Sequence, residues 1–478
     1  MSISDSGFVP SRCRVLVVMW MAGASGCTAL PVDLGYQETN ALLEARIGVA
    51  PKFSSDARNL HAAPEVPTTP IDPGQAVRLA FLHSPRVAES YSRIGLSRAD
   101  LEAARRLVNP GFGFSYLNSS QGGEQVGRSL TLNLTDIVLR PVRKRYAATA
   151  LEQMQLQVAS ELQALATDVE VGWYDAVAAN QICATRALIA EAATQSASLA
   201  QRFFAAGNIN RLELALEKAA AAGAMIESSR AKGRAVQARA DLATLLGLSV
   251  AERWTTTELP DLPADLVTDS AALLELAMER RLDLAAARKQ LSLREDALAM
   301  TRRWRWLGRF EVGYEREREV DSSVIRGPTF AVELPIFNQG QDVIARAQAQ
   351  RVEAQSRLDQ ATLQARNDIH AAVASTQLAR EVAERYRADL LPEREIAVAK
   401  TQAEVNFMLK GVFELILSKQ VEYDAWQGYI ESVRDYWITR ARLRAAVGGR
   451  LPDDPDSVQA MPQRATPVSE HHEHGDQP

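Results

Sequence analysis

Polar and apolar residues alternate strictly in four short segments of this chain. One pair of segments lies at 111–116 and 129–135, and a second pair lies at 310–314 and 329–335. Alternation with a period of two is the pattern of a β-strand that has one apolar and one polar face. We therefore predict four strands, at about 111–120, 127–137, 309–319 and 327–336.

The apolar faces of these strands permit two interpretations. In a transmembrane barrel, the apolar side chains meet lipid and the polar ones line a lumen. In a soluble protein, the same pattern would belong to ordinary hairpins that cover a core. Beyond the N-terminal region, no segment of about 18 residues is continuously apolar. If this chain spans a membrane, it must therefore do so with strands.

Long helical stretches follow each pair of predicted strands, at 141–203 and 341–406. Both are rich in Ala, Gln, Glu and Arg, which suits closely packed coiled helices. At a rise of 1.5 Å per residue, the first stretch would be roughly 95 Å long. Pro392 should kink or divide the second stretch. Because helices in globular proteins average about 11–12 residues, these lengths predict a mainly α-helical, elongated fold with a small β part.

The helices and strands occur twice in the same order. A helical segment precedes the strands at 85–108 and again at 283–304, about 200 residues later. We therefore divide the central chain into a first structural repeat at 71–250 and a second at 251–450.

Each long stretch ends in a break that contains glycine, Ala206–Asn208 in the first copy and Leu409–Gly411 in the second. A returning helix follows each break, and it ends on Gly247 or Gly448. Glycine is a common C-terminal stop of a helix. The sequence therefore predicts one long helical hairpin in each repeat.

The N-terminus has the features of a secretory signal. Two arginines precede an apolar run at 15–22, and small residues lead from there to Cys27. The run is shorter than the roughly 20 helical residues that cross a bilayer, and it fits the apolar core of a signal peptide. The small residues resemble a lipoprotein cleavage site, which would make 1–26 the signal and Cys27 the acylated first residue. A plain signal peptide with an incidental cysteine is the alternative.

The two ends of the mature chain look less ordered. Residues 27–70 are rich in Pro and Ala and predict an extended N-terminal arm. Residues 451–478 predict a disordered tail with a histidine and acidic end. His471, His472 and His474 could bind a metal ion weakly, since imidazole suits copper, zinc and nickel. An incidental cluster is the alternative.

Composition excludes several classes of function. The net charge of −5 argues against a nucleic-acid partner, which would call for a basic excess. Three cysteines at these spacings make neither a disulfide framework nor a zinc site. We find no phosphate loop, dinucleotide fingerprint or helix-borne zinc motif. We therefore expect no enzyme activity and no cofactor.

Closure of the sheet requires more than one copy of the chain. Four strands cannot form a closed barrel, because the smallest known membrane barrels have about eight. Open strand edges in lipid would cost several kcal/mol per unsatisfied backbone group. Three copies would supply twelve strands.

The order of these elements resembles the TolC-like outer-membrane efflux proteins over roughly 71–450. The resemblance rests on the doubled pattern, on the lipoprotein signal, and on two local motifs, Leu334–Gly340 and Asn406–Leu415. The second motif is similar to the branch that serves heavy-metal exporters of the resistance-nodulation-division (RND) type. Thr28 rather than Asp after Cys27 favours, by resemblance, a destination in the outer membrane.

The resemblance implies a homotrimeric channel-tunnel of a tripartite efflux system in the outer membrane of a Gram-negative bacterium. Three protomers would form a 12-stranded barrel continuous with an α-helical tunnel in the periplasm. Its partners would be outer-membrane lipid, a periplasmic adaptor and an inner-membrane RND-type pump. Heavy-metal cations are the expected cargo, and organic compounds or drugs are the alternative. A periplasmic coiled-coil lipoprotein without a transport role also stays open.

The resemblance also assigns roles to residues near the hairpin breaks. The tips that meet the adaptor would include Gly207, Asn208, Lys410 and Gly411. Acidic rings narrow the tunnel in this family, and a ring of carboxylates favours cations. The gate candidates here are Glu213, Glu217, Glu414 and Glu422. Exposed charges on a helix face are the alternative interpretation of these glutamates.

Overall fold

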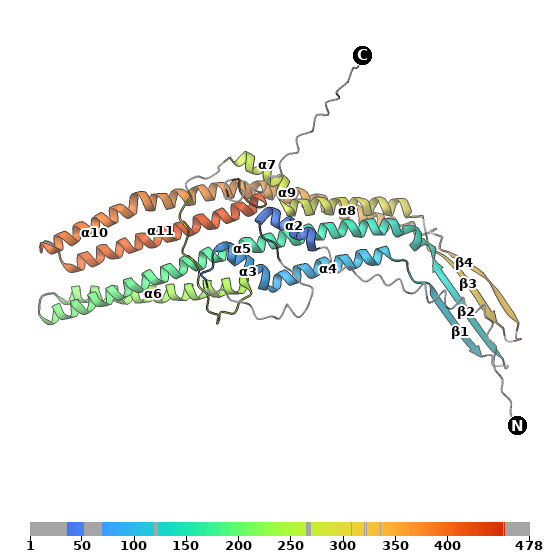
Figure 1. Ribbon diagram of the computed structural model, residues 1–478, viewed down its shortest axis with the longest axis horizontal. Coiled ribbons are helices and arrows are strands. Elements are labelled where there is room, and N and C mark those ends of the chain that lie inside the picture. Colours follow the sequence, from blue (N-terminus) through green and yellow to red (C-terminus); the bar gives the residue numbers. More distant parts are fainter. Residues whose placement is uncertain are drawn as a thin grey trace, which may run out of the picture.

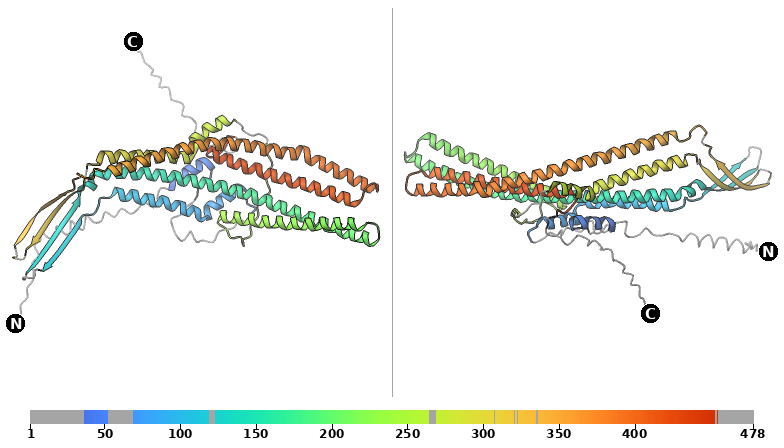
Figure 2. Two further views of the ribbon diagram at one scale, coloured as in Figure 1. Left: turned by 180° about the vertical axis from the view of Figure 1, so that it is seen from behind. Right: turned by 90° about the horizontal axis from the view of Figure 1, so that it is seen from above.

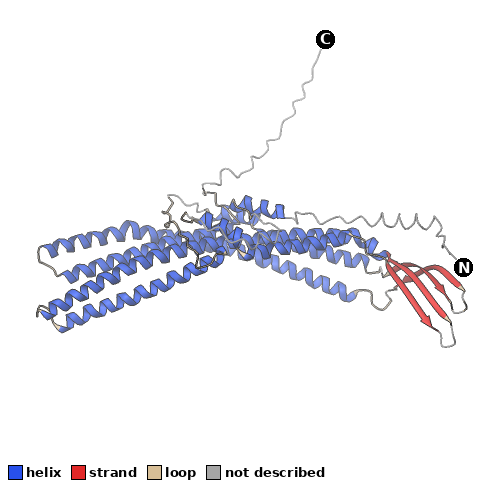
Figure 3. Cartoon of the chain, turned by 60° about the horizontal axis from the view of Figure 1, so that its bottom comes forward, coloured by secondary structure: helices blue, strands red, loops and turns tan. Residues whose placement is uncertain are grey.

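The computed structural model is an elongated bundle of helices with a small sheet at one end (Figure 1). Two helical hairpins lie at the opposite end, and helix dominates throughout (Figures 2 and 3). The predicted fold class, mainly helical with four antiparallel strands, is confirmed. The structure describes residues 36–51, 69–118, 123–263, 269–306, 308–319, 321, 323–334, 336–452 and 454.

The two repeats follow the same order of elements, except that three helical segments in the second repeat replace the single long helix of the first. The first comprises α3 (Pro73–His83), α4 (Pro85–Arg105), β1 (Gly111–Asn118), β2 (Glu124–Asn133), α5 (Leu134–Ala205) and α6 (Arg211–Leu246). The second comprises α7 (Ser270–Arg280), α8 (Leu282–Trp304), β3 (Phe310–Arg318), β4 (Val324–Val332), α9 (Gln341–Arg385), η2 (Tyr386–Leu390), α10 (Leu391–Asn406) and α11 (Val412–Val447). None of the described helices carries an apolar stretch of the length that crossing a membrane requires.

The four strands form one antiparallel sheet in the order β1-β2-β3-β4. Gly111 to Asn118 pair with Thr131 to Glu124, and Phe310 to Arg318 pair with Val332 to Val324. The central pair, β2 and β3, joins the two repeats. The outer strands β1 and β4 leave one open edge each.

The second and fourth strands end earlier than predicted. β2 stops at Asn133 rather than near residue 137, because Asn133 caps α5 through its side chain and the Asp136 N–H. An acidic residue in the first turn also suits the helix dipole. The hydroxyl of Thr135 accepts from Phe310 N at 2.8 Å and donates to Gly308 O at 3.0 Å. Thr135 therefore links the start of α5 to the start of β3.

Pro392 divides the second long helix, as predicted. It is the second residue of α10, and the five residues of η2 before it form a π-helical turn. Leu391 N–H bonds to Tyr386 O, five residues back. Proline has no N–H and clashes with the carbonyl four residues back, so one wider turn accommodates it. The turn places the Tyr386 hydroxyl against Gly428 of α11.

Two glycines form equivalent joints in the middle of the molecule. Gly247 follows α6 with φ +73°, and its α-carbon faces the backbone of His83–Ser84, between α3 and α4. Gly448 follows α11 with φ +87° and faces Arg280–Arg281, between α7 and α8. In each repeat, the end of the returning helix is thus seated on the junction of the two short helices.

The main core lies beside the first of these joints. Trp173 of α5 is fully buried and donates from Nε1 to Ile71 O at 2.9 Å. Ile71 O also accepts from Thr257 N at 3.2 Å. Tyr174 stacks on Trp437 of α11 with ring centroids 5.7 Å apart. The core therefore ties both repeats to the chain segments that connect them.

The predicted extended arm contains a helix, α2 (Tyr36–Ile47), so that part of the interpretation is wrong. Its sequence holds Ala, Leu, Glu and Arg, which are good helix formers, and the prolines that argued against helix lie downstream. Leu43 is fully buried, and Tyr36 packs edge-on against Tyr91 of α4 at 5.1 Å between ring centroids. Tertiary packing thus stabilises a helix whose hydrophobic period is weak.

Candidate functional site: the sheet, the hairpin ends and the central cavity

One face of the sheet is apolar next to the helices. In register, Phe112 lies opposite Leu130, which lies opposite Tyr314, and Val312 lies opposite Phe330. The large apolar side chains exposed on this face include Phe112, Phe114, Leu130, Leu132, Tyr314, Phe330 and Val332. An apolar surface of this kind is typical of a face that contacts lipid or a partner.

The opposite face is polar and built from small residues. Glycine stands opposite serine or threonine in three places, Gly113–Ser129, Gly127–Ser115 and Gly313–Thr329. A Cβ at any of these glycines would overlap the facing hydroxyl. Three glutamates of β3 also lie on this face: Glu311, Glu315 and Glu317.

The two hairpin ends have the same backbone geometry. At the first, Gly207 N bonds to Phe204 O at 3.0 Å and Asn208 N bonds to Phe203 O at 2.8 Å. At the second, Met408 and Leu409 repeat the pattern with Val405 O and Glu404 O, both at 2.9 Å. This is a Schellman motif, whose penultimate residue needs a positive φ.

The residue in the left-handed position differs between the two ends. Gly207 holds it at φ +77°, whereas in the second copy Met408 holds it at φ +58°. Gly411 is instead the N-cap of α11 with an extended backbone, φ −83° and ψ 157°. The structural counterpart of Gly411 is therefore Asn210, the N-cap of α6, and that of Gly207 is Met408.

The second hairpin end presents an apolar surface. Phe407, Met408 and Leu409 are 79%, 94% and 75% exposed. Lys410 beside them pairs with Glu404 at 2.8 Å. The first end is polar there, with Gly207 and Asn208. Exposed consecutive apolar residues favour a protein partner at this place.

Two gate candidates lie at equivalent places near the hairpin ends. Glu213 forms a capping box with Asn210, whose N–H donates to Glu213 Oε2 at 3.3 Å. Glu414 holds the same third position of α11. Both side chains are exposed. Glu213 therefore has a local structural role besides any role in a pore.

The other two candidates have partners within the chain. Glu217 accepts a hydrogen bond from Ser196 of α5, 2.7 Å from Oγ to Oε2. Glu422 is buried and paired with Lys419. When the two returning helices α6 and α11 are aligned, the position equivalent to Glu422 is Ala221, which is also buried. These two glutamates are therefore not equivalent in the two copies.

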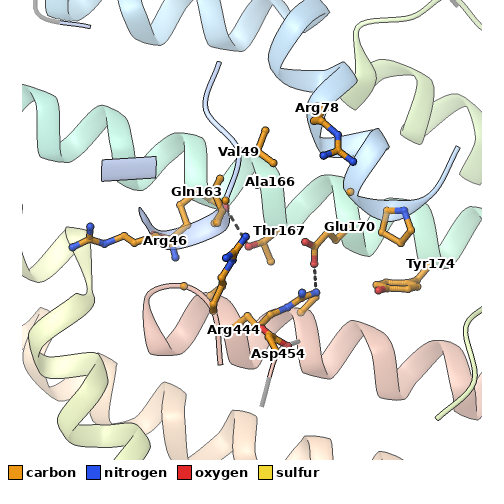
Figure 4. Close-up of a pocket in the computed structure, with 18 residues that line it drawn as sticks. Arg46, Val49, Arg78, Gln163, Ala166, Thr167, Glu170, Tyr174, Arg444 and Asp454 are labelled. Carbon is orange, nitrogen blue, oxygen red and sulfur yellow. Dashed lines mark hydrogen bonds and ion pairs between the residues drawn. The ribbon is translucent and has the colours of Figure 1, made fainter. Parts of the chain in front are cut away.

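A cavity of about 370 Å³ lies in the middle of the bundle, between α2, α3, α5 and α11 (Figure 4). Its charged lining residues are Arg46, Arg78, Glu170, Arg444, Arg450 and Asp454. Glu170 forms an ion pair with Arg444 across it. Arg46 connects three segments, because its Nε donates to Arg280 O at 3.0 Å and its carbonyl accepts from Arg450 N at 3.0 Å. This cavity is a joint between both repeats and the ends of the described chain.

Glu170 should make stability depend on pH. Burial raises its pKa above the usual carboxyl value, more than Arg444 lowers it, and Asp454 raises it further. A carboxyl whose folded pKa is raised stabilises the fold at low pH and loses that contribution as pH rises through the folded pKa. We expect the melting temperature of the protein, relative to Glu170→Gln, to fall as pH rises above about 4.5.

The control for this measurement is Glu353→Gln, which removes an exposed carboxylate of α9. Melting curves of the three proteins between about pH 4 and pH 8, a range that begins near the usual pKa of a glutamate carboxyl, test the expectation. A constant difference between the wild type and Glu170→Gln across that range would contradict it.

Several predicted sites lie outside the described residues. These are Cys27 with the signal at 1–26, and the histidines His471, His472 and His474. Within the part of the chain that the structure describes, no group of three or more His, Cys, Asp or Glu residues could hold a metal ion. Cys183 lies half-buried on α5 as a free thiol.

Several solved structures of outer-membrane channels have a fold similar to that of this chain. The CmeC outer membrane channel of Campylobacter jejuni superposes with a TM-score of 0.68 and 14% identity, covering 79% of this chain and 85% of CmeC. CusC gives 0.63 and 15%, covering 81% and 100%. The open state of the Neisseria gonorrhoeae MtrE outer membrane channel gives 0.63 and 15%, covering 78% and 88%. The chain adopts the TolC-like fold.

Sequence comparison covers less of the chain. Protein CyaE of Bordetella pertussis (strain Tohama I) is 29% identical over 188 residues, which span 37% of this chain and 40% of CyaE. The match thus extends over less than half of that relative. No family model matches the chain. The TolC-like fold accounts for the order of the doubled helices and strands and for the position of the sheet at one end of the bundle.

Proposed function

We propose that this protein is the outer-membrane channel of a tripartite efflux system and that it works as a homotrimer without enzymatic activity. The observation that carries the proposal is the open four-stranded sheet, apolar on one face and polar on the other, at the end of a long helical bundle. Its two unpaired edges need further strands, since unsatisfied backbone groups are costly in lipid. Three copies give twelve strands.

The same architecture supports a location in the outer membrane of a Gram-negative bacterium, with the helices in the periplasm. The apolar face would contact outer-membrane lipid, and the polar face would line the lumen. Acylation of Cys27 would add a lipid anchor, worth about 0.8 kcal/mol per buried CH₂. Replacing Cys27 by serine should abolish labelling with a radioactive fatty acid; unchanged labelling would remove the anchor from the proposal.

The single most direct test is conductance. The detergent-purified protein should insert into a planar bilayer as a trimer and conduct ions. The mass of the inserted species is determined on the same sample, so that a trimer can be distinguished from a monomer. A monomer that never inserts would contradict the channel and favour the alternative, a periplasmic coiled-coil lipoprotein whose strands are soluble.

The hairpin ends are the proposed contact with a periplasmic adaptor, which would connect the channel to an inner-membrane RND-type pump. Gly411→Arg tests this cleanly, because Gly411 has an ordinary φ and no atom within 4 Å of an added Cβ. We expect trimer assembly and conductance to persist and cross-linking to the adaptor to fall. Gly207→Arg adds backbone strain at φ +77° and is the less specific variant. Persistent efflux and cross-linking in Gly411→Arg would disprove the tip assignment.

Heavy-metal cations are the proposed cargo, with organic compounds as the alternative for the same architecture. The three glutamates of β3 support a cation path, since carboxylates lining a lumen favour cations. A triple variant should lower the cation-to-anion permeability ratio severalfold; it combines Glu311→Gln, Glu315→Gln and Glu317→Gln. Reversal potentials in a salt gradient measure it. The matched control replaces Arg128, Arg316 and Arg326 by Gln on the other face of the same strands, and it should leave the ratio unchanged.

A further inference from the structure

Three arginines stand in one row across the sheet. Arg128 of β2 pairs with Arg316 of β3, and Arg316 pairs with Arg326 of β4. Residues paired in this way project from the same face with Cβ atoms about 4.5–5.5 Å apart. All three side chains are exposed. Phe114 of β1, which pairs with Arg128, completes the row.

The row lies on the apolar face of the sheet. The neighbouring row toward the helices is Phe112, Leu130, Tyr314 and Pro328, and the next contains Leu132, Val312 and Phe330. The charges of β3 are sorted by face, because Arg316 and Arg318 alternate with Glu315 and Glu317. The arginines therefore share a surface with aromatic and aliphatic side chains and not with the glutamates.

The row lacks counter-charges of its own. No ion pair joins Arg128, Arg316 or Arg326 to a carboxylate within the described chain. Glu124, farther along the same face, hydrogen-bonds to Tyr116. Like charges directly opposite each other in a sheet destabilise it. An arrangement of three facing guanidinium groups becomes favourable when an external anion lies among them.

The position of the row indicates which anion it meets. Successive rows on one face are two residues apart, about 6.8 Å at 3.4 Å per residue. With Phe310 and Val332, which pair at the helical end, three apolar rows separate the arginines from that end of the sheet. The next row toward the hairpin turns holds Tyr116, Val126, Arg318 and Val324, so a fourth arginine follows on the same face. The arginines therefore stand in the half of the sheet that is nearer the hairpin turns. In a membrane this is the level of the lipid headgroups of the leaflet farther from the helices.

We propose that Arg128, Arg316 and Arg326 bind the phosphate groups of lipid headgroups in that leaflet. Guanidinium groups match phosphate with two parallel hydrogen bonds each, and they are more weakly hydrated than ammonium groups. Phe114 and Tyr314 beside the row would contact the start of the acyl chains. The inference rests on the proposed function only in placing this face of the sheet against lipid. In a trimer, the site would occur three times.

The test counts lipids on the full-length protein by native mass spectrometry. Detergent-purified protein is offered a doubly phosphorylated glycolipid, the same glycolipid after dephosphorylation, or inorganic phosphate. The wild type should retain the phosphorylated glycolipid and not the dephosphorylated form. The variant Arg128→Gln, Arg316→Gln, Arg326→Gln should bind it about a hundredfold more weakly, as loss of three cations near a membrane surface predicts.

The glutamate variant of the opposite face, Glu311→Gln, Glu315→Gln, Glu317→Gln, is the matched control and should retain the lipid. Equal retention by the arginine variant and the wild type would overturn the proposal, as would equal binding of the two glycolipids. Displacement of the lipid by millimolar inorganic phosphate would assign the row to free phosphate and overturn the lipid assignment.

Conductance in neutral phosphatidylcholine bilayers separates this inference from the proposed function. If the wild type conducts but does not discriminate between the two glycolipids, only the proposed lipid-phosphate site is contradicted. If the wild type does not conduct but does discriminate between them, the proposed channel function is contradicted and the phosphate site is supported.

Discussion

Gly247→Ala is expected to lower the free energy of unfolding by about 2–5 kcal/mol, of which roughly 1–2 come from the left-handed backbone and the rest from overlap with packed atoms. An added Cβ would lie 2.5 Å from His83 O and 2.8 Å from Ser84 N. These atoms belong to the α3–α4 junction and cannot rotate away as a flexible side chain can. The melting temperature by circular dichroism, together with the trimer fraction, measures the loss.

Two further glycines make this prediction specific. Gly207→Ala has nearly the same φ, but no atom lies within 4 Å of its Cβ, so it should show the backbone cost alone and only at the hairpin end. Gly448→Ala should resemble Gly247→Ala, because its Cβ would lie 2.9 Å from the Arg280 carbonyl carbon. Equal losses of unfolding free energy in Gly247→Ala and Gly207→Ala would mean that the close contact between Gly247 and the α3–α4 junction does not contribute to the loss.

Trp173→Ala should cost about 3–5 kcal/mol, the range for removal of a buried large side chain. Trp173 is 0% exposed and its Nε1 bonds to Ile71 O, so the variant leaves a cavity and removes one hydrogen bond. Thr257 N still bonds to the same carbonyl, which limits the additional penalty. We expect loss of the cooperative melting transition or a much lower melting temperature.

The control for this variant is Trp306→Ala, since Trp306 is 54% exposed near the sheet. It should change the melting temperature of the detergent-solubilised protein only slightly. If Trp173→Ala were as stable as Trp306→Ala, the core around Ile71 would not be the main source of stability in the central region.

The sequence predicted the elements with strong periodicity. The four strands and the long helices lie where alternation and helical spacing placed them, and Pro392 divides α9 from α10 because a proline acts through its own ring and missing N–H. The predicted C-terminal ends of β2 and β4 were less accurate. Thr135 and Ile137 continue a β-branched pattern, but the Asn133 cap decides in favour of helix, and capping depends on a single side chain.

Features that depend on register or packing escaped the sequence analysis. The arginine row becomes visible only when β2, β3 and β4 are paired, because its members are separated by 188 and 10 residues along the chain (316 − 128 and 326 − 316). Met408 gives no signal of a positive φ, since methionine rarely adopts one. Helix α2 forms because Leu43 and Tyr36 find partners in the fold.

The position of α2 on the helical bundle limits how far Cys27 can lie from that bundle. Glu38 contacts Gln155 of α5 at 3.5 Å, and Gln155 lies 21 residues (155 − 134) from the sheet end of α5, roughly 32 Å along the helix. From Cys27 to Tyr36 there are nine residues, which span at most about 32 Å when fully extended. If Cys27 is acylated as proposed, its acyl group would just reach the level of the sheet. A deletion between Cys27 and Tyr36 should either detach α2 from the helical bundle or withdraw the acyl group from the membrane. An insertion in the same segment should be tolerated.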